Sequence, residues 1–191
     1  MIYDEIGVQS GLAFSLNSIG VICKKKGLWN KALEYFKRSQ AIREEIGDRG
    51  GLTFSLNSIG IIYKNKGLWD EALQHFERSR AISEEIGNRV GLANSLDNIG
   101  IIYNKKGLWD GALKCFKRSR AIREEIGHQL GLAWTLFHMS DVYEKQERLA
   151  EAEQVLIQTV RIFEEVGGRH LDNARKQLDK VRKLQRIASQ K

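Results

Sequence analysis

Hydrophobic residues recur along this chain at the spacing of an α-helix, in short stretches that glycines separate. In residues 51–90 an apolar stripe falls on every third or fourth position, and it comprises Leu52, Leu56, Ile59, Gly60 and Tyr63. A second stripe follows after Gly67, and it comprises Trp69, Ala72, Phe76, Ser79, Ile82 and Ile86. Such spacing places each set on one face of a helix. The pattern therefore predicts two helices, near residues 52–66 and 69–86, with Trp69 and Phe76 largely buried between them.

The same pattern returns every 40 residues without insertion, in repeats 11–50, 51–90, 91–130 and 131–170. The second and third repeats agree at 26 of 40 positions. The repeats predict helix pairs at 12–26 with 29–46, 52–66 with 69–86, 92–106 with 109–126, and 132–146 with 149–166. A fixed period of this size is typical of a solenoid, in which each unit packs on its neighbours. No strand pattern competes, and the chain has no proline to interrupt a helix.

The two ends of the chain differ from the repeats. Residues 2–7, IYDEIG, match the close of a second helix at 42–47, which predicts a helical stub at 1–7 that precedes the first repeat. Residues 171–188 carry apolar positions at helical spacing with a polar back, as a terminal capping helix of an array requires. We expect a single array over residues 1–191, which is either a piece of a longer array or one closed by the stub.

Composition and charge argue for a folded protein that binds other molecules. The net charge is +7, but residues 168–191 hold eight of the 31 basic residues and only two of the 24 acidic ones. The repeats are thus nearly neutral, and nucleic acid is not the expected partner. The N-terminus does not resemble a signal peptide, and no run of 18 apolar residues predicts a membrane span. The two cysteines form no metal-spaced pair and favour a reducing, cytoplasmic location.

Chemistry-bearing motifs are missing from the sequence. The four histidines are scattered, no nucleophile is paired with a base, and the glycines fall at helix ends and crossings rather than in a phosphate loop. We therefore expect no enzyme activity, no cofactor and no metal.

The repeat resembles the tetratricopeptide repeat in its pattern Leu56-x-x-Ile59-Gly60-x-x-Tyr63, then Gly67-x-Trp69-x-x-Ala72, then Phe76. Its 40-residue length is similar to that of kinesin light chains, of the spindle adaptor LGN and of prokaryotic arrays. The resemblance covers about residues 3–170. It implies an all-α, right-handed superhelical solenoid of helix-turn-helix repeats, in which the first helix of each pair lines a concave groove that binds a peptide or a helix of a partner.

Carried over residue by residue, the resemblance implies a groove built from the first helices. Its predicted lining is Phe14, Asn17, Ser18, Val21 and Lys25; Phe54, Asn57, Ser58, Ile61 and Asn65; Asn94, Asp97, Asn98, Ile101 and Lys105; and Trp134, Phe137, His138, Asp141 and Lys145. Lys24, Lys64, Asn104 and Glu144 continue the same face. Asparagine amides there would pair with a peptide backbone, and the apolar residues would form pockets.

Two features separate this groove from well-known ones. Val21, Ile61 and Ile101 stand where a carboxylate clamp needs polar groups, and only Asn98 matches an asparagine ladder of the LGN type. Plainer interpretations stay open as well. Phe14 and Phe54 would then pack on a neighbouring repeat, and the asparagines would be ordinary solvated residues.

The sequence thus predicts a non-enzymatic module that binds a protein or peptide partner in its groove. Two alternatives remain. One is a scaffold that self-assembles through the ends of the array, including a homo-oligomer through its N-terminal face. The other is the sensor or recruitment arm of a larger signalling protein.

Overall fold

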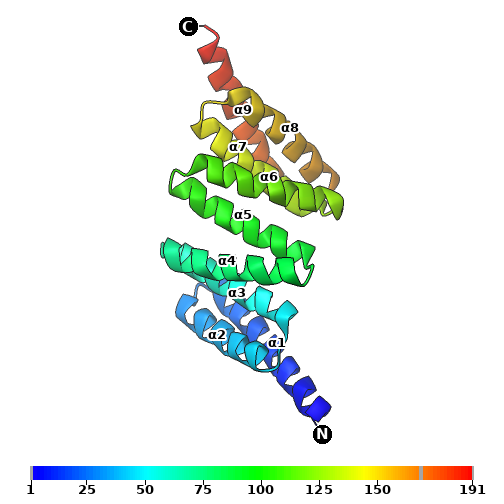
Figure 1. Ribbon diagram of the computed structural model, residues 1–191. Helices are drawn as coiled ribbons and strands as arrows, with labels where there is room; N and C mark the ends of the chain where they lie inside the picture. The colour runs from blue at the N-terminus through cyan, green and yellow to red at the C-terminus, as the bar shows by residue number, and fades with distance from the viewer. Residues whose placement is uncertain (1, 168–169, 191) are drawn as a thin grey trace. The chain divides into compact units, whose positions relative to one another are not determined.

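The computed structural model describes residues 2–167 and 170–190 of the chain. Within those ranges the chain forms α-helices and no strands, which confirms the all-α prediction. The helices are α1 (Ile2–Lys25), α2 (Trp29–Glu45), α3 (Arg49–Asn65), α4 (Trp69–Glu85), α5 (Arg89–Lys105), α6 (Trp109–Glu125), α7 (Gln129–Lys145), α8 (Leu149–Glu165) and α9 (Leu171–Ala188). A first helix packs on the second helix that follows it in the pairs α1 with α2, α3 with α4, and α7 with α8 (Figure 1).

The chain divides into two compact units, residues 1–98 and 99–191, and the division falls inside α5. In the first unit α2 also packs on α3, and in the second α6 packs on α7 and α8 packs on α9. The capping helix predicted at 171–188 is α9, and it covers α8 as expected. The prediction of one continuous array over both units stays a prediction.

The start of the chain departs from the predicted stub. We expected a separate helical piece at residues 1–7 and a first helix from residue 12, but α1 runs unbroken from Ile2 to Lys25. Every other glycine that closes a second helix, such as Gly47, has a positive φ, whereas Gly7 does not. Gly7 therefore does not end a helix as its counterparts do, although the surrounding residues match.

The first helices also begin three residues earlier than predicted. The expected start at residue 52 is in fact Arg49, because Asp48 caps the helix: its Oδ1 accepts a hydrogen bond from the Gly51 amide at 2.8 Å. Asn88 does the same for α5 by accepting from the Gly91 amide at 2.9 Å. Such side-chain acceptors satisfy amides that have no partner within the helix.

The tight turns inside each repeat depend on one left-handed residue. At Gly67 φ is +77°, and the Leu68 amide then donates back to the Tyr63 carbonyl at 3.0 Å, which ends α3. The fourth repeat has Glu147 at the same place with φ +58°. A side chain there is strained because its Cβ crowds the backbone in this region.

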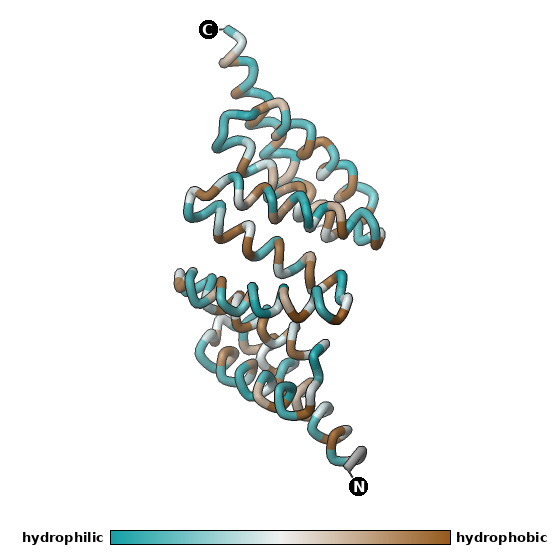
Figure 2. The backbone as a smooth tube through the Cα atoms, viewed as in Figure 1, coloured by the Kyte–Doolittle hydropathy of each residue, from teal (hydrophilic) through white to brown (hydrophobic). Residues whose placement is uncertain are grey.

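The helix pairs of the first three repeats are each centred on a phenylalanine that lies against a glycine. Phe36 and Phe76 are fully buried, and a Cβ added to Gly20 or Gly60 would come within 2.6 Å of the facing ring. In the first unit Phe36 also joins a core cluster with Ala32, Ile59 and Ile62, so one ring ties α2 to α3 of the next repeat. Figure 2 shows the resulting alternation of hydrophobic and hydrophilic residues around the helices.

The prediction for Phe76 is confirmed, but the prediction for Trp69 is wrong. Trp69 leaves 36% of its surface exposed. It is the first residue of α4 and follows the turn at Gly67 directly. A residue at a helix start lies away from the crossing of the two helices, where Phe76 is buried, so its ring keeps part of its surface exposed.

Phe76→Ala should lower the free energy of unfolding by about 3–5 kcal/mol, as large truncations in a packed core do. Urea unfolding followed by circular dichroism measures the loss. Gln74→Ala, on the exposed side of the same helix, is the matched control and should stay within about 0.5 kcal/mol of the parent. A loss below about 1 kcal/mol for Phe76→Ala would mean that this ring does not organise the core.

Glu147→Gly should raise the free energy of unfolding by about 1 kcal/mol, because glycine adopts a positive φ without the steric cost that Glu147 bears. The reciprocal change Gly107→Ala, at φ +74°, should destabilise the protein by a similar amount. The same urea titration measures the free energy of unfolding of both variants. Equal stability of Glu147→Gly and the parent would contradict the assignment of strain.

Candidate functional site

The predicted groove residues fall into three classes of exposure. The exposed ones are Phe14, Ser18, Lys25, Phe54, Asn65, Asn94, Lys105 and Lys145. The half-buried ones are Val21, Asn57, Ile61, Asn98, Ile101, Trp134, Phe137, His138 and Asp141, and the buried ones are Asn17, Ser58 and Asp97. The face is therefore mixed, and only part of it is accessible to a partner.

In the first unit, α1, α2 and α3 together form a small hollow of about 180 Å³. Its lining comprises Phe14, Asn17, Ser18, Val21, Arg43 and Phe54. The two phenylalanines leave 68% and 52% of their surfaces exposed, so they do not pack on a neighbouring repeat as the plainer interpretation held. Exposed aromatic rings beside a hollow are typical of a binding surface.

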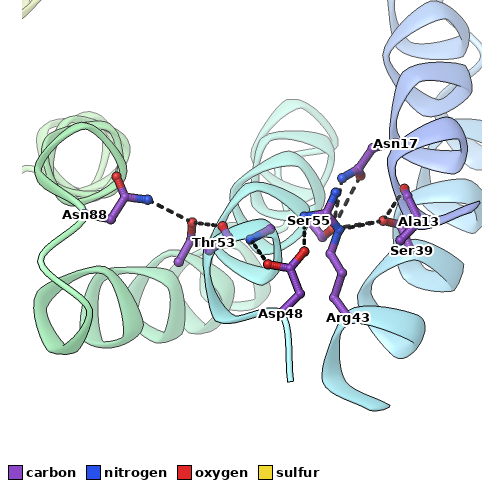
Figure 3. Close-up of polar contacts among 10 residues, drawn as sticks. Ala13, Asn17, Ser39, Arg43, Asp48, Thr53, Ser55 and Asn88 are labelled. Atoms are coloured by element: carbon purple, nitrogen blue, oxygen red, sulfur yellow. Dashed lines mark hydrogen bonds and ion pairs between the residues drawn. The ribbon is translucent and has the colours of Figure 1, made fainter. Parts of the chain in front are cut away.

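The floor of this hollow is a polar network that joins two repeats (Figure 3). Ser39 of α2 donates to the Ala13 carbonyl of α1 at 2.8 Å, and its Oγ lies 3.3 Å from the Ser55 Oγ of α3. Asn17 donates to the Ser55 Oγ at 3.2 Å. These groups are buried, so each needs a partner inside the protein, and together they fix the register of α1, α2 and α3.

Arg43 closes one end of the network. It is buried, and it donates from Nε to the Ser39 Oγ at 3.2 Å and from Nη1 to Asp48 Oδ2 at 3.0 Å. Burial lowers the pKa of Arg43, and the Asp48 carboxylate opposes that shift. Gly51 leaves the room for this side chain, because a Cβ there would overlap the guanidinium.

The network repeats one step further along the first unit. Asn57 donates to the Ser79 Oγ at 2.7 Å, and Ser95 donates to Asn57 Oδ1 at 3.2 Å. This corrects the role predicted for two asparagines. Asn17 and Asn57 were expected to pair with a peptide backbone, but their amides are occupied within the protein. The serines at positions 39, 55, 79 and 95, which recur with the repeat, were the sequence signal for this network.

Basic side chains lie one helical turn beyond the hollow. Lys24 and Lys25 follow Val21 on α1, and Lys64 follows Ile61 on α3. The Lys64 ammonium is half-buried and donates to Asn98 Oδ1 at 2.7 Å.

Burial and repulsion from neighbouring lysines lower the pKa values of Lys64 and Lys24. The pKa of Lys64 is lowered from 10.5 to about 8, chiefly by burial and then by the charge of Lys24, while the charge of Asp97 acts in the opposite direction. Burial and the neighbouring Lys25 also lower the pKa of Lys24. An ammonium in such surroundings is better stabilised by an anion than by the neutral Asn98 amide.

The second unit presents a different face. The predicted groove aromatics of α7 pack on one another: the Trp134 ring lies 5.9 Å from Phe137 and 6.1 Å from His138, edge-on and stacked respectively. Trp134 also meets His170 at 4.5 Å and Phe163 at 5.6 Å. The rings satisfy one another and leave little apolar surface for a ligand.

The polar residues of that unit are also paired. Asn104 donates to Asp141 Oδ2 at 3.2 Å and accepts from Lys145 at 2.9 Å. Glu144 accepts from Gln177 of α9 at 2.6 Å and from Lys180. The capping helix thus engages the end of the face that the sequence assigned to the groove. Within residues 2–167 and 170–190, no three His, Cys, Asp or Glu side chains gather as a metal ion would need.

The chain belongs to the tetratricopeptide repeat family, whose profile matches residues 11–85, 52–125 and 91–165. Tetratricopeptide repeats are protein-interaction modules, and the chain is therefore built as one. No protein with a curated function matches the chain in sequence.

Solved structures share the fold at low identity. Aspartyl phosphate phosphatase F from Bacillus subtilis superposes with a TM-score of 0.80 at 16% identity, over 85% of this chain and 43% of that protein. BtubC (BKLC) from P. vanneervenii gives 0.71 at 14% identity, over 98% and 85%. The TPR-like repeats of a putative kinesin light chain from Podosopora anserina give 0.68 at 17% identity, over 96% and 98%. The chain thus spans less than half of the length of phosphatase F, and these likenesses show the fold alone.

The pKa of Lys64 predicts a pH dependence of stability. Because the folded pKa, about 8, lies below the ordinary 10.5, the unfolded chain binds more protons between these values, and the free energy of unfolding should rise with pH across that window. Urea unfolding from about pH 7 to about pH 10 should show this rise relative to Lys64→Met, which has no ammonium to discharge. Lys31→Met, at an exposed position, should track the parent. Parallel curves for the parent and Lys64→Met would contradict the burial of this charge.

Proposed function

We propose that the protein is a non-enzymatic recruitment module whose first unit binds an extended peptide of a partner protein. The observation that carries this is the hollow between Phe14 and Phe54, with lysines one turn away. An apolar side chain of the peptide enters the hollow, where both rings lose exposed surface. Apolar contact then supplies affinity, and the charged rim fixes register.

The surroundings favour an acidic peptide. Lys24, Lys25 and Lys64 lie on the same side of the hollow, and a carboxylate beside Lys64 would offset the cost of burying its charge. An aspartate or glutamate about one helical turn, or roughly 5 Å, from the apolar anchor would reach these groups. Asn65, which is exposed, lies next to Lys64 and can hydrogen-bond the peptide backbone.

The charge of the second unit supports a protein partner over nucleic acid. Arg175 and Arg182 of α9 donate to Glu164 and Glu153, each at 2.7 Å, and Lys180 pairs with Glu144. The basic residues that dominate the net charge are thus partly neutralised by α7 and α8. Within residues 2–167 and 170–190, Cys23 and Cys115 form no disulfide, which supports our proposal of a cytoplasmic location.

A library of random peptides displayed on phage tests the proposal. Selected sequences should carry a large apolar residue with aspartate or glutamate nearby. Phe54→Glu should weaken a selected peptide at least about tenfold in titration calorimetry, because it places a charge in the hollow. Lys64→Gln should weaken it as well and should reduce the dependence on salt.

Gln74→Glu is the control, since it adds the same charge on an exposed side of α4. It should leave affinity unchanged, and circular dichroism should show all three variants folded. Selected peptides that bind Phe54→Glu as tightly as the parent would place the binding surface elsewhere.

A further inference from the structure

The outer side of α1 is an apolar face that its counterparts bury. Val8, Leu12 and Ile22 leave 72%, 48% and 54% of their surfaces exposed, and Ile19 is exposed as well. Leu52, Ile59 and Ile62 occupy the places of Leu12, Ile19 and Ile22 in the next repeat, and all are buried. There Ile59 and Ile62 pack against Ala32 and Phe36 of α2. Leu132, Met139 and Val142 repeat the arrangement under α6.

The exposed face has the spacing of a helix-helix seam. Val8, Leu12, Ser15, Ile19 and Ile22 follow one another at alternating intervals of four and three residues. This is the period with which two helices pack along their length. Ser15 does not interrupt the face as a polar group, because its hydroxyl donates to the Gly11 carbonyl at 2.9 Å. Figure 1 shows the first turns of α1 reaching past α2, so this part of the seam is open.

We propose that α1 of a second copy of the chain covers this face, in an antiparallel pair about a two-fold axis near Ser15. The seam is symmetric about that residue to within one position: Val8 and Ile22 lie seven residues on either side of it, and Leu12 and Ile19 lie three and four. An antiparallel partner places Val8 against Ile22 of the other copy and Leu12 against Ile19. A two-fold interface requires such a self-complementary surface.

The charged residues at the two ends of the seam also favour the antiparallel orientation. Glu5 lies on the seam one turn before Val8, and Lys26 lies one turn after Ile22; both are exposed. In the antiparallel pair the Glu5 carboxylate of one copy faces the Lys26 ammonium of the other. A parallel pair would bring the three-lysine ends together, which is unfavourable. The open backbone at Gly7 and Gly11, where an added Cβ would meet nothing within 4 Å, lets the helices approach closely.

A lipid bilayer is the rival occupant. Residues 5–25 of α1 are long and apolar enough to cross a membrane by length and composition. The opposite side of the same helix, however, packs on α2 and holds the buried Asn17, which bonds to Ser55. A spanning helix would have to leave these partners. The seam is also only one stripe wide, as a protein contact needs, and it is flanked by Gly11, Ser18 and charged ends.

Sedimentation equilibrium of the whole chain from about 1 μM to about 1 mM tests the pairing over the range in which weak dimers form. The parent should show a monomer–dimer equilibrium, and Leu12→Asp and Ile22→Asp should each weaken it at least about tenfold. Ile157→Asp is the matched control. It introduces the same charge at a similarly exposed apolar position of α8, so it should dimerise as the parent does. Circular dichroism confirms that each variant is folded.

Orientation is tested by mixed disulfides in a background with Cys23→Ser and Cys115→Ser. Val8→Cys and Ile22→Cys proteins should cross-link when mixed and oxidised, and neither should cross-link with itself. Self-cross-linking of Val8→Cys would show a parallel pair and overturn the proposed geometry.

A parent that stays monomeric throughout overturns the proposal. In that case, flotation of the protein with phosphatidylcholine vesicles would identify a lipid bilayer as the partner of this face. If the protein does not float with the vesicles, the remaining candidate is the second helix of a further repeat. The peptide selection on the hollow does not depend on this result, because the hollow that Phe14 and Phe54 line is on the other side of α1 from the seam.

Discussion

The close approach of a phenylalanine ring to a glycine backbone is the contact on which each repeat depends. Phe36, Phe76 and Phe116 fill the crossing of their helix pairs, and a Cβ on the facing glycine would come within 2.6–2.7 Å of the ring. The helices can cross at this distance only because the glycine has no side chain. The fourth repeat changes both partners together: Ser140 stands in the place of the glycine and Leu156 in that of the ring, and both are buried. A gain of volume on one helix is matched by a loss on the other, as close packing requires.

Once the pairs are set, the serine and asparagine network decides how neighbouring repeats meet. Its hydroxyls and amides are buried, so a shift of register would leave them without partners at a cost of about 1–3 kcal/mol each. Ser83 shows what happens when one member changes. It replaces the arginine of the first and third repeats, and its hydroxyl is buried without a partner in the described part of the chain. The second repeat is thus the place where this network is incomplete.

The same network determines which side chains of the first helices remain exposed to solvent. With Asn17 and Asn57 held inward by this network, Phe14 and Phe54 are left facing solvent. In the second unit, the aromatic rings of α7 contact one another, and Glu144 accepts a hydrogen bond from α9. Two units of one repeat type therefore present different surfaces on their first helices: Phe14 and Phe54 are exposed in the first unit, whereas Trp134 and Phe137 are half-buried in the second.

The sequence alone determined the helix pairs, the turns and most of the core, because these depend on local period and on residues such as Gly67 and Phe76 that recur in register. It also indicated which side chains share the face on which we propose the site, since side chains three and four apart lie on one side of a helix. It did not show that Asn17 and Asn57 are occupied, that Trp69 is partly exposed, or that α1 continues through Gly7. Those depend on which groups another helix brings within bonding distance and on where a partner helix is missing. Spacing within one helix carries no information about either, so only the tertiary structure decided them.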